Sequence, residues 1–245
     1  MSTHEPTIGI LYPGFSAEDD YPRFEALLGG DVTLPVQHTL MNEDAHRLDA
    51  LLDWGRPETL AAGADALRDK QIDAVLWACT SGSFAYGWDG AHEQASGLAE
   101  HAGVPASSTS LAFVHALRAL ELKTVAVAAT YPADVAALFV DFLNAGGIEV
   151  AKVSSHEIIT AAEVGTLTAD RLLDITVAGD DPAAQAVLLP DTAFHTAAHL
   201  ELLEQRLGKP VLTANQVTVW KSLRLVGAPV HRVGLGRLFR DAVGV

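Results

Sequence analysis

The chain has 245 residues, and 49 % of them are hydrophobic, which is enough to fill a folded core and too many for an intrinsically disordered protein. Its 31 Asp and Glu residues outnumber its 16 Lys and Arg residues and give a formal net charge of −15. A field of that sign repels nucleic acid and anionic membrane surfaces, so we exclude both as expected partners. It also repels small carboxylates, so an anionic ligand has to be held by local donors such as backbone N–H groups.

No apolar run approaches the roughly 18 residues that a membrane-spanning helix needs, and the polar segment 1–7 does not resemble a signal peptide. We therefore expect a cytoplasmic protein. Cys79 is the only cysteine, which excludes an internal disulfide and a cysteine-rich zinc site. Taken alone, such a residue is usually a small buried apolar side chain, and it is the neighbours of Cys79 that favour a chemical role.

Short apolar runs rich in Val, Ile and Leu predict strands that are covered on both faces, as in a parallel sheet. In chain order the predicted strands are Ile8–Tyr12, Val32–Leu40, Ala74–Ala78, Thr124–Ala129, Glu149–Val153, Ala186–Leu189 and Pro210–Thr213. Helical periodicity predicts helices over Pro57–Lys70, Ala91–His101, Leu111–Leu120, Ala133–Ala145, Ala169–Val177, Ala197–Leu207 and Gln216–Leu225. The alternation of strands and helices indicates a doubly wound α/β architecture.

The chain also contains a weak internal repeat of three segments. In the same order, residues 7–13 resemble 124–132, residues 73–80 resemble 185–192, and residues 103–110 resemble 208–215. The helices predicted after the third pair each contain a Leu-Arg step, at Leu117-Arg118 and Leu223-Arg224.

Three matches in one order predict two pseudo-symmetric α/β lobes, each with a central, mainly parallel sheet. We expect residues 1–112 together with 217–245 to form the first lobe and residues 113–216 to form the second. Ligands of open α/β sheets bind beyond the carboxyl ends of the strands, so the active site is expected in the cleft between the lobes.

Cys79 and Asp191 are equivalent positions of the repeat, and each follows an apolar strand, so we expect them to face each other across this cleft. Pro13, Gly14 and Tyr131 follow the first strand of each copy and should line the same cleft. The Tyr131 hydroxyl can donate a hydrogen bond to a carboxylate, although core filling is an equally reasonable role for this side chain.

The segment from Cys79 to Gly82 predicts a tight turn whose N–H groups and hydroxyls can hold a carboxylate. A thiol beside such N–H groups has its thiolate form favoured. Asp191 has two interpretations: it is an acid/base group, or it caps the helix predicted over Ala197–Leu207.

Asp191, His195 and His199 are spaced four residues apart, which on a helix would gather them on one face as metal ligands. The predicted helix begins only at residue 197, so we expect capping or solvent-facing histidines and predict no metal. His115 lies on an apolar helix and is expected to be packed or partnered rather than catalytic.

Several of these segments resemble the aspartate/glutamate racemase superfamily. They are Thr7-Ile8-Gly9-Ile10 with Pro13, the turn Cys79-Thr80-Ser81, the Tyr131 position, Val187-Leu188-Leu189 before Asp191, and the stretch from Trp220 to Leu225. The likeness is greater to the maleate isomerase and arylmalonate decarboxylase branch and covers nearly the whole chain. The C-terminal stretches Arg224-Leu225-Val226-Gly227 and Gly236-Arg237-Leu238-Phe239 look especially like the decarboxylases.

The resemblance implies two pseudo-symmetric lobes, no cofactor and a pair of cysteines on either side of the substrate. Cys79 matches the first cysteine, which acts as the nucleophile in maleate isomerases, and Asp191 stands where the second cysteine belongs. Arylmalonate decarboxylases typically have glycine at the first position and use the second cysteine to protonate the product. The positions that hold the substrate carboxylate in the family are matched by Thr80, Ser81, Tyr131 and Thr192.

We therefore expect a cofactor-independent isomerase that acts on a small (di)carboxylate in the manner of maleate cis-trans isomerases, with Cys79 as nucleophile and Asp191 handling the proton. The alternatives are an arylmalonate-type decarboxylase or one-base racemase/epimerase, in which Cys79 protonates one face of an enediolate, and a non-catalytic carboxylate-binding protein. The expected partner is a small carboxylate substrate, without nucleic acid or membrane, and homo-oligomerisation is left open.

Overall fold

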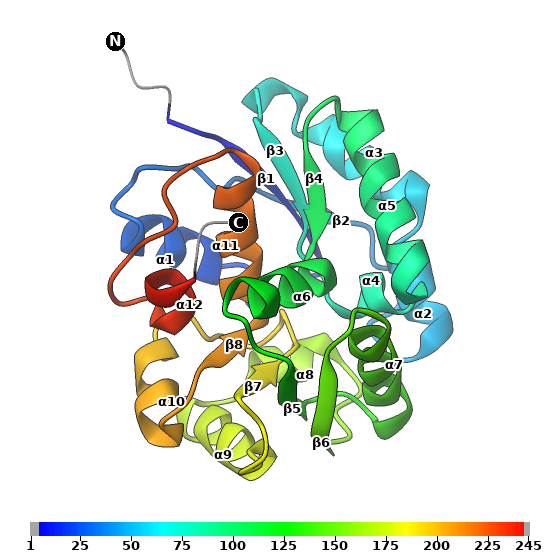
Figure 1. Cartoon of the computed structure of the whole chain (residues 1–245). Helices are drawn as coiled ribbons and strands as arrows, with labels where there is room; N and C mark the ends of the chain where they lie inside the picture. The colour runs from blue at the N-terminus through cyan, green and yellow to red at the C-terminus, as the bar shows by residue number, and fades with distance from the viewer. Residues whose placement is uncertain (1–4, 243–245) are drawn as a thin grey trace.

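The computed structural model describes residues 5–242 and contains two four-stranded sheets in which all neighbouring strands are parallel (Figure 1). The first sheet has the order β2-β1-β3-β4 and consists of β1 (Ile8–Pro13), β2 (Val36–Thr39), β3 (Ala74–Trp77) and β4 (Ala106–Ser108). The second has the equivalent order β6-β5-β7-β8 and consists of β5 (Thr124–Ala129), β6 (Glu149–Ser155), β7 (Ala186–Leu189) and β8 (Val211–Thr213). The predicted α/β class with two pseudo-symmetric parallel sheets is confirmed.

Helices connect the strands and flank both sheets. Up to β5 they are α1 (Asp20–Leu27), α2 (Leu48–Trp54), α3 (Pro57–Ala66), the 3-10 turn η1 (Arg68–Lys70), α4 (Ser81–Phe84), α5 (Gly87–Ala102) and α6 (Thr109–Ala119). After β5 they are α7 (Ala133–Ala145), α8 (Ala161–Gly165), α9 (Ala169–Gly179), α10 (Leu200–Leu207), α11 (Ala214–Leu225) and α12 (Gly236–Asp241). Between residues 5 and 242, no helix combines the length and apolar character that a membrane crossing requires.

The strands whose sequences repeat take equivalent places in the two sheets. They are the pairs β1 and β5, β3 and β7, and β4 and β8. Helices α6 and α11 follow β4 and β8 directly and pack against each other in the middle of the molecule (Figure 1). The division into lobes at residues 112–113 and 216–217 stays a prediction, and residues 1–4 and 243–245 of it lie outside the described part of the chain.

Two predicted strands differ from the observed ones for local reasons. The run predicted over Val32–Leu40 forms a strand only from Val36, since Pro35 has no N–H to donate to a sheet ladder. Strand β4 was not predicted, because Ala106-Ser107-Ser108 has no apolar pattern and becomes a strand only by pairing with β3.

Helix ends follow the predicted signals in some places and tertiary contacts in others. Thr168 caps α9 with its hydroxyl, and Gly208 ends α10 in the left-handed conformation with φ = 72°. Helix α10, predicted from Ala197, begins only at Leu200. The reason is tertiary, because the backbone N–H groups of Thr196 and Ala197 donate to the Asp20 carboxylate at 2.8 and 3.2 Å.

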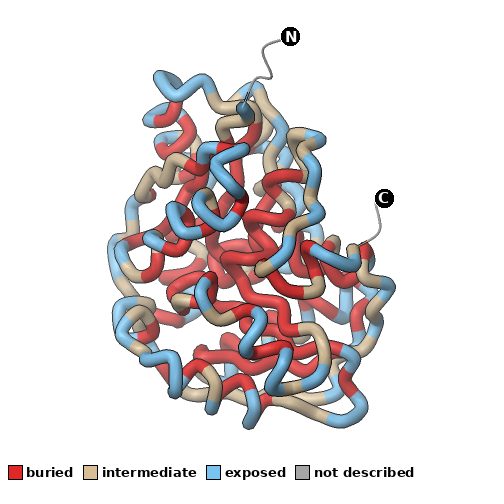
Figure 2. Tube along the Cα trace, turned by 90° about the vertical axis from the view of Figure 1, so that its left-hand side faces the viewer, coloured by how far each residue is buried: buried red, intermediate tan, exposed pale blue. Residues whose placement is uncertain are grey.

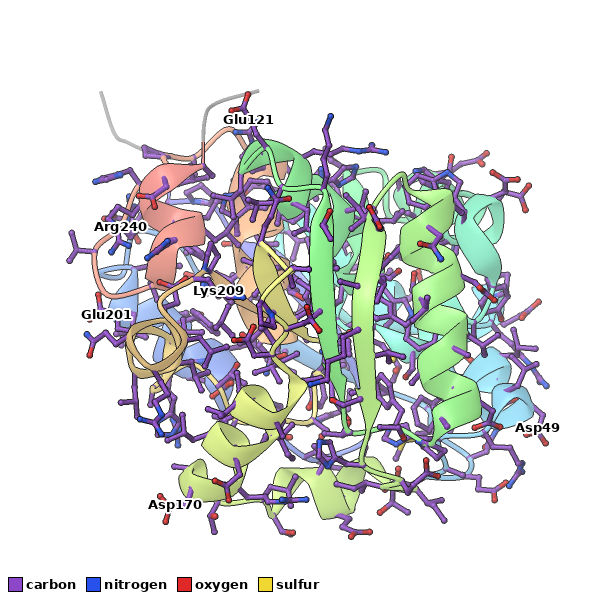
Figure 3. The ribbon with its side chains drawn as sticks, turned by 60° about the horizontal axis from the view of Figure 1, so that its bottom comes forward. Asp49, Glu121, Asp170, Glu201, Lys209 and Arg240 are labelled. Atoms are coloured by element: carbon purple, nitrogen blue, oxygen red, sulfur yellow. The ribbon has the colours of Figure 1, made fainter. Side chains whose placement is uncertain are left out.

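One continuous apolar core joins the two sheets, and the exposed backbone surrounds it (Figure 2). Its buried aromatic side chains include Phe84 and Phe113 from the first half and Phe139 from the second. The ring of Phe139 lies 5.3 Å from that of Phe84 and 5.6 Å from that of Phe113, measured between centroids. Helices that precede and follow β5 therefore share one aromatic cluster. Glu121 and Asp170, which are labelled in Figure 3, lie at the periphery of the molecule.

A buried polar joint reinforces this core where α1 and α11 meet the segment after β7. The Asn215 side chain donates to the Asp20 carboxylate and to the Thr192 carbonyl, both at 3.1 Å, and accepts from the Tyr21 hydroxyl at 3.2 Å. Asp20, Tyr21 and Asn215 are all fully buried. Burial raises the pKa of Asp20, and the hydrogen bonds from Thr196 and Asn215 oppose that rise.

Replacing Asn215 with leucine should destabilise the fold by about 2–4 kcal/mol, because Asp20 and Tyr21 each lose a buried partner. Urea unfolding followed by circular dichroism measures this change. The matched control is Asn144→Leu on an exposed position, for which we expect a change within about 0.5 kcal/mol. Equal stabilities of the two variants would contradict a structural role for the joint.

Candidate active site

Cys79 and Asp191 occupy equivalent places in the two halves of the molecule. Each lies two residues beyond the end of its strand, Cys79 after β3 and Asp191 after β7. Cys79 is 2 % exposed and Asp191 is 4 % exposed. The negative charge of Asp191 acts on the Cys79 thiol and raises its pKa, so the two side chains share one electrostatic environment.

The turn after Cys79 holds its sulfur against a backbone donor. The Gly82 N–H donates to Cys79 Sγ at 3.2 Å, and the Ser81 hydroxyl lies 3.8 Å from the same sulfur. A Cβ atom on Gly82 would lie 3.0 Å from Sγ and 3.1 Å from the indole of Trp77. A side chain at this position would therefore have to displace the Cys79 sulfur or the Trp77 ring by a few tenths of an ångström.

Burial controls the protonation of the thiol. It raises the pKa of Cys79 to about 12, the charge of Asp191 adds to that rise, and the hydrogen bonds from Gly82 and Ser81 oppose it without cancelling it. The neighbouring N–H groups do favour the thiolate, as expected, but burial outweighs their effect. At neutral pH the Cys79 side chain is a protonated thiol. The Gly82 N–H and the Ser81 hydroxyl lie where they can stabilise its thiolate form.

The Asp191 carboxylate is held from two sides. It accepts hydrogen bonds from the Thr130 hydroxyl on Oδ2 and from the Ala193 N–H on Oδ1, the latter at 2.9 Å. The residue at the start of α10 is His199, and its side chain makes no capping bond. The helix-cap interpretation of Asp191 is therefore wrong, and the acid/base interpretation stays a prediction.

Tyr131 lies beside both of these groups. Burial raises its pKa strongly, and the charges of Asp191 and of an ionised Cys79 act in the same direction. Its hydroxyl donates to the Pro190 carbonyl at 2.8 Å. Because a hydroxyl has one proton to donate, a substrate carboxylate can accept it from Tyr131 only in place of the Pro190 carbonyl.

The remaining predicted positions differ in how directly they join the cluster. The Thr80 hydroxyl is buried and has no hydrogen-bond partner among residues 5–242. Thr192 is 6 % exposed and uses its carbonyl to accept from Asn215. Pro13 and Gly14 are buried at the end of β1, and no hydrogen bond of the described residues joins them to Cys79 or Asp191.

Tyr12 is a member of the cluster that the sequence reasoning missed. Its hydroxyl donates to the Thr192 carbonyl at 3.0 Å and accepts from the Ala17 N–H at 3.0 Å, and the Asp191 charge contributes to raising its pKa. The signal was present in the repeat, where the segment that contains Tyr12 aligns with the segment that contains Tyr131.

The loop after β2 contacts Tyr131 and the segment that leads into α8. The His46 ring lies 4.8 Å from the Tyr131 ring, and the His46 N–H donates to the Ile159 carbonyl at 2.6 Å. The Asp44 carboxylate accepts from the N–H groups of Ala161 and Ala162 at 2.7 and 3.0 Å.

The histidines near Asp191 do not gather around it. His195 Nε2 lies 2.7 Å from the carboxylate of Asp19, the residue before α1, and His199 precedes α10. Within the described range, no three His, Cys, Asp or Glu side chains are arranged to hold a metal ion.

Comparison with known proteins identifies the family. A profile of the arylmalonate decarboxylase family matches residues 56–239. The chain belongs to the arylmalonate decarboxylase family. It is 30 % identical over 179 residues to a maleate isomerase of Geobacillus stearothermophilus. These residues cover 70 % of this chain and 71 % of the isomerase. To the arylmalonate decarboxylase of Bordetella bronchiseptica it is 28 % identical over 148 residues, which cover 59 % of this chain and 62 % of the decarboxylase.

Solved structures agree with this assignment to the family. A liganded arylmalonate decarboxylase, mutated from glycine to cysteine at one position and from cysteine to serine at another, matches with a TM-score of 0.86. The identity is 26 %, and the match covers 97 % of this chain and all of that one. The predicted branch of the superfamily is confirmed by these matches.

In this family member, Asp191→Asn should lower the pKa of Cys79, because it removes a negative charge. The amide can keep its oxygen toward the Ala193 N–H and donate its N–H to the Thr130 hydroxyl, which can also accept. The ultraviolet absorbance of the thiolate, titrated against pH with Cys79→Ser as the blank, measures the change. Glu121→Gln, at an exposed position on the periphery (Figure 3), should leave the pKa of Cys79 unchanged. An unchanged pKa in Asp191→Asn would show that the two side chains are not coupled.

Proposed function

We propose that this chain is a cofactor-independent isomerase that interconverts the cis and trans forms of a small dicarboxylate, with Cys79 as nucleophile and Asp191 as its proton partner. The observation that carries the proposal is the pairing of the chain's single thiol with a carboxylate at the equivalent point of the second sheet, in one buried environment. The similarity to maleate isomerases supports the choice of reaction.

The proposed first step is a proton transfer followed by addition. The Cys79 thiol gives its proton to the Asp191 carboxylate, and the resulting thiolate accepts a hydrogen bond from the Gly82 N–H. Sulfur then forms a bond to one alkene carbon, and the electron pair of the double bond moves onto the neighbouring carbon, where the attached carboxylate delocalises it as an enediolate. Neither redox chemistry nor a co-reactant is needed.

The second half of the reaction reverses these bonds. The former double bond is now single, so the molecule rotates about it. The electron pair returns to form the trans double bond, the carbon–sulfur bond breaks, and the thiolate regains its proton from Asp191. The transferred negative charge lies in turn on the Asp191 carboxylate, on the Cys79 sulfur and on the enediolate, so Cys79 and Asp191 are never both ionised.

The substrate carboxylates are proposed to bind at the turn after Cys79. Thr80 is the readiest donor, because its buried hydroxyl has no partner among the described residues. Ser81, Tyr131 and Thr192 are proposed as the other contacts, and Pro13 with Gly14 as the adjoining wall. Local donors of this kind are necessary because the net charge of −15 repels a dianion over longer distances.

Maleate incubated with the protein should give fumarate, seen directly by proton NMR. Cys79→Ala should reduce turnover by roughly 10³-fold or more, because it removes the atom that forms the covalent bond. Asp191→Asn should reduce it by about 10²–10⁴-fold through loss of the proton partner. Glu121→Gln serves as the control with wild-type turnover, and unchanged turnover in Cys79→Ala would end the proposal.

One observation favours decarboxylation as a second candidate. A thiol whose pKa is raised to about 12 is a proton donor at neutral pH, and the family profile is that of a decarboxylase. In this reaction the bond from the α-carbon to one carboxylate breaks, CO₂ leaves, and the electron pair stays on the carbon as an enediolate. Cys79 then donates its proton to one face of that carbon and regains a proton from water.

Substituted malonates in deuterated water distinguish the two candidates. Decarboxylation releases CO₂ and leaves one deuterium on the α-carbon of a product of single handedness. Turnover of malonates without any turnover of maleate would replace the isomerase with the decarboxylase. A thermal shift with dicarboxylates and no turnover on either substrate class would instead identify a carboxylate-binding protein.

A further inference from the structure

A cavity lies at the junction of α6 and α11, away from Cys79 and Asp191. It has a volume of about 300 Å³ and is lined by His115, Arg118 and Ala119 of α6 and by Trp220, Lys221 and Arg224 of α11. These helices pack against each other between the two sheets (Figure 1). None of the lining residues belongs to the cluster around Cys79.

The cavity arises from the internal repeat. Arg118 and Arg224 are the arginines of the two Leu-Arg steps, and each has a second nitrogen-bearing side chain three residues earlier, His115 or Lys221. Because side chains three residues apart lie on one helix face, the two helices present equivalent pairs to the shared cavity.

Positive charge is concentrated here in a chain that is otherwise strongly acidic. Three of the 16 Lys and Arg residues line the cavity, whereas the whole chain carries −15. Neither Arg118 nor Lys221 forms an ion pair with any residue between 5 and 242; Arg118 instead donates to the Gly146 carbonyl at 2.8 Å.

The pKa values of Lys221 and His115 agree with the absence of an ion pair to Arg118 or Lys221 among the described residues. Burial lowers the pKa of Lys221, and the neighbouring Arg224 lowers it further. Burial lowers the pKa of His115 to about 4, with further contributions from Lys221, Arg118 and His92. These directions are those of cationic side chains that lie close together and are partly removed from water.

Two buried polar atoms of the lining also lack partners. Trp220 is 2 % exposed, and neither its indole Nε1 nor Nδ1 of His115 has a hydrogen-bond partner in the described part of the chain. An indole nitrogen can only donate, so what it lacks is an acceptor. Buried donors of this kind are normally satisfied, and an unsatisfied one requires an explanation.

A purely structural role accounts for part of this arrangement. Arg118 and Arg224 lie in the last turns of their helices, where a cation stabilises the negative end of the helix dipole. Arg224 also lies over the Trp220 ring, 5.6 Å from its centroid. Neither effect explains why, among residues 5–242, Lys221 has no ion pair and the Trp220 indole nitrogen has no hydrogen-bond acceptor.

We propose that this cavity binds a small organic or inorganic dianion, a dicarboxylate or a phosphate. Lys221, Arg118 and Arg224 supply the opposite charge, and the Trp220 N–H donates to one of its oxygens. The volume fits a ligand at the small end of the range for small-molecule sites. The protein then has an anion site separate from Cys79, at the contact between the helices that follow β4 and β8.

Calorimetric titration with succinate and with inorganic phosphate tests this site, at constant ionic strength and in the Cys79→Ser background so that no covalent chemistry occurs. Lys221→Met should weaken the binding of at least one of the two anions by roughly tenfold or more. Lys123→Met removes the same charge from an exposed position outside the cavity and should weaken binding by less than about twofold. Whichever anion binds more tightly identifies the ligand chemistry.

Trp220→Phe provides an independent variant, because it keeps an aromatic ring and removes only the indole N–H. It should also weaken binding while the melting temperature of the protein without ligand stays within a few degrees. Three results would overturn the proposal: no saturable binding of either anion, equal weakening by Lys123→Met and Lys221→Met, or a Lys221→Met variant that changes only the oligomeric state in sedimentation. The last result would show that this face pairs with an acidic surface of a second copy.

Discussion

A thiol and a carboxylate occupy one buried environment, and the negative charge of Asp191 makes ionisation of Cys79 more difficult. In the proposed mechanism, one proton and one negative charge are exchanged between these two side chains. The Gly82 N–H stabilises that charge when it lies on sulfur, and the Thr130 and Ala193 donors stabilise it when it lies on the carboxylate. The proposed isomerisation uses this exchange.

The duplicated architecture provides the geometry for the exchange. Equivalent strands end at equivalent points, and the two halves are held together by the Phe84–Phe139 aromatic contact and the Asn215 joint. The same Asn215 fixes the Thr192 carbonyl, which also accepts from Tyr12. Stability of the fold and alignment of the site consequently depend on one set of buried hydrogen bonds.

Features that follow from local pattern could be predicted from the sequence. Apolar runs gave strands such as Thr124–Ala129, and the order of the repeats gave the equivalence of Cys79 and Asp191. Features that depend on distant partners could not be predicted. The start of α10 depends on Asp20, which lies more than 170 residues earlier, and the protonation of Cys79 depends on a burial that only the folded chain creates.

The most direct test of the account is a crystal structure with a non-reactive dicarboxylate bound. The account predicts one ligand carboxylate within hydrogen-bond distance of Thr80 and Ser81, with Cys79 Sγ and the Asp191 carboxylate on opposite sides of its central carbons. A ligand bound well away from the sulfur, or touching Cys79 while Asp191 points elsewhere, would contradict it.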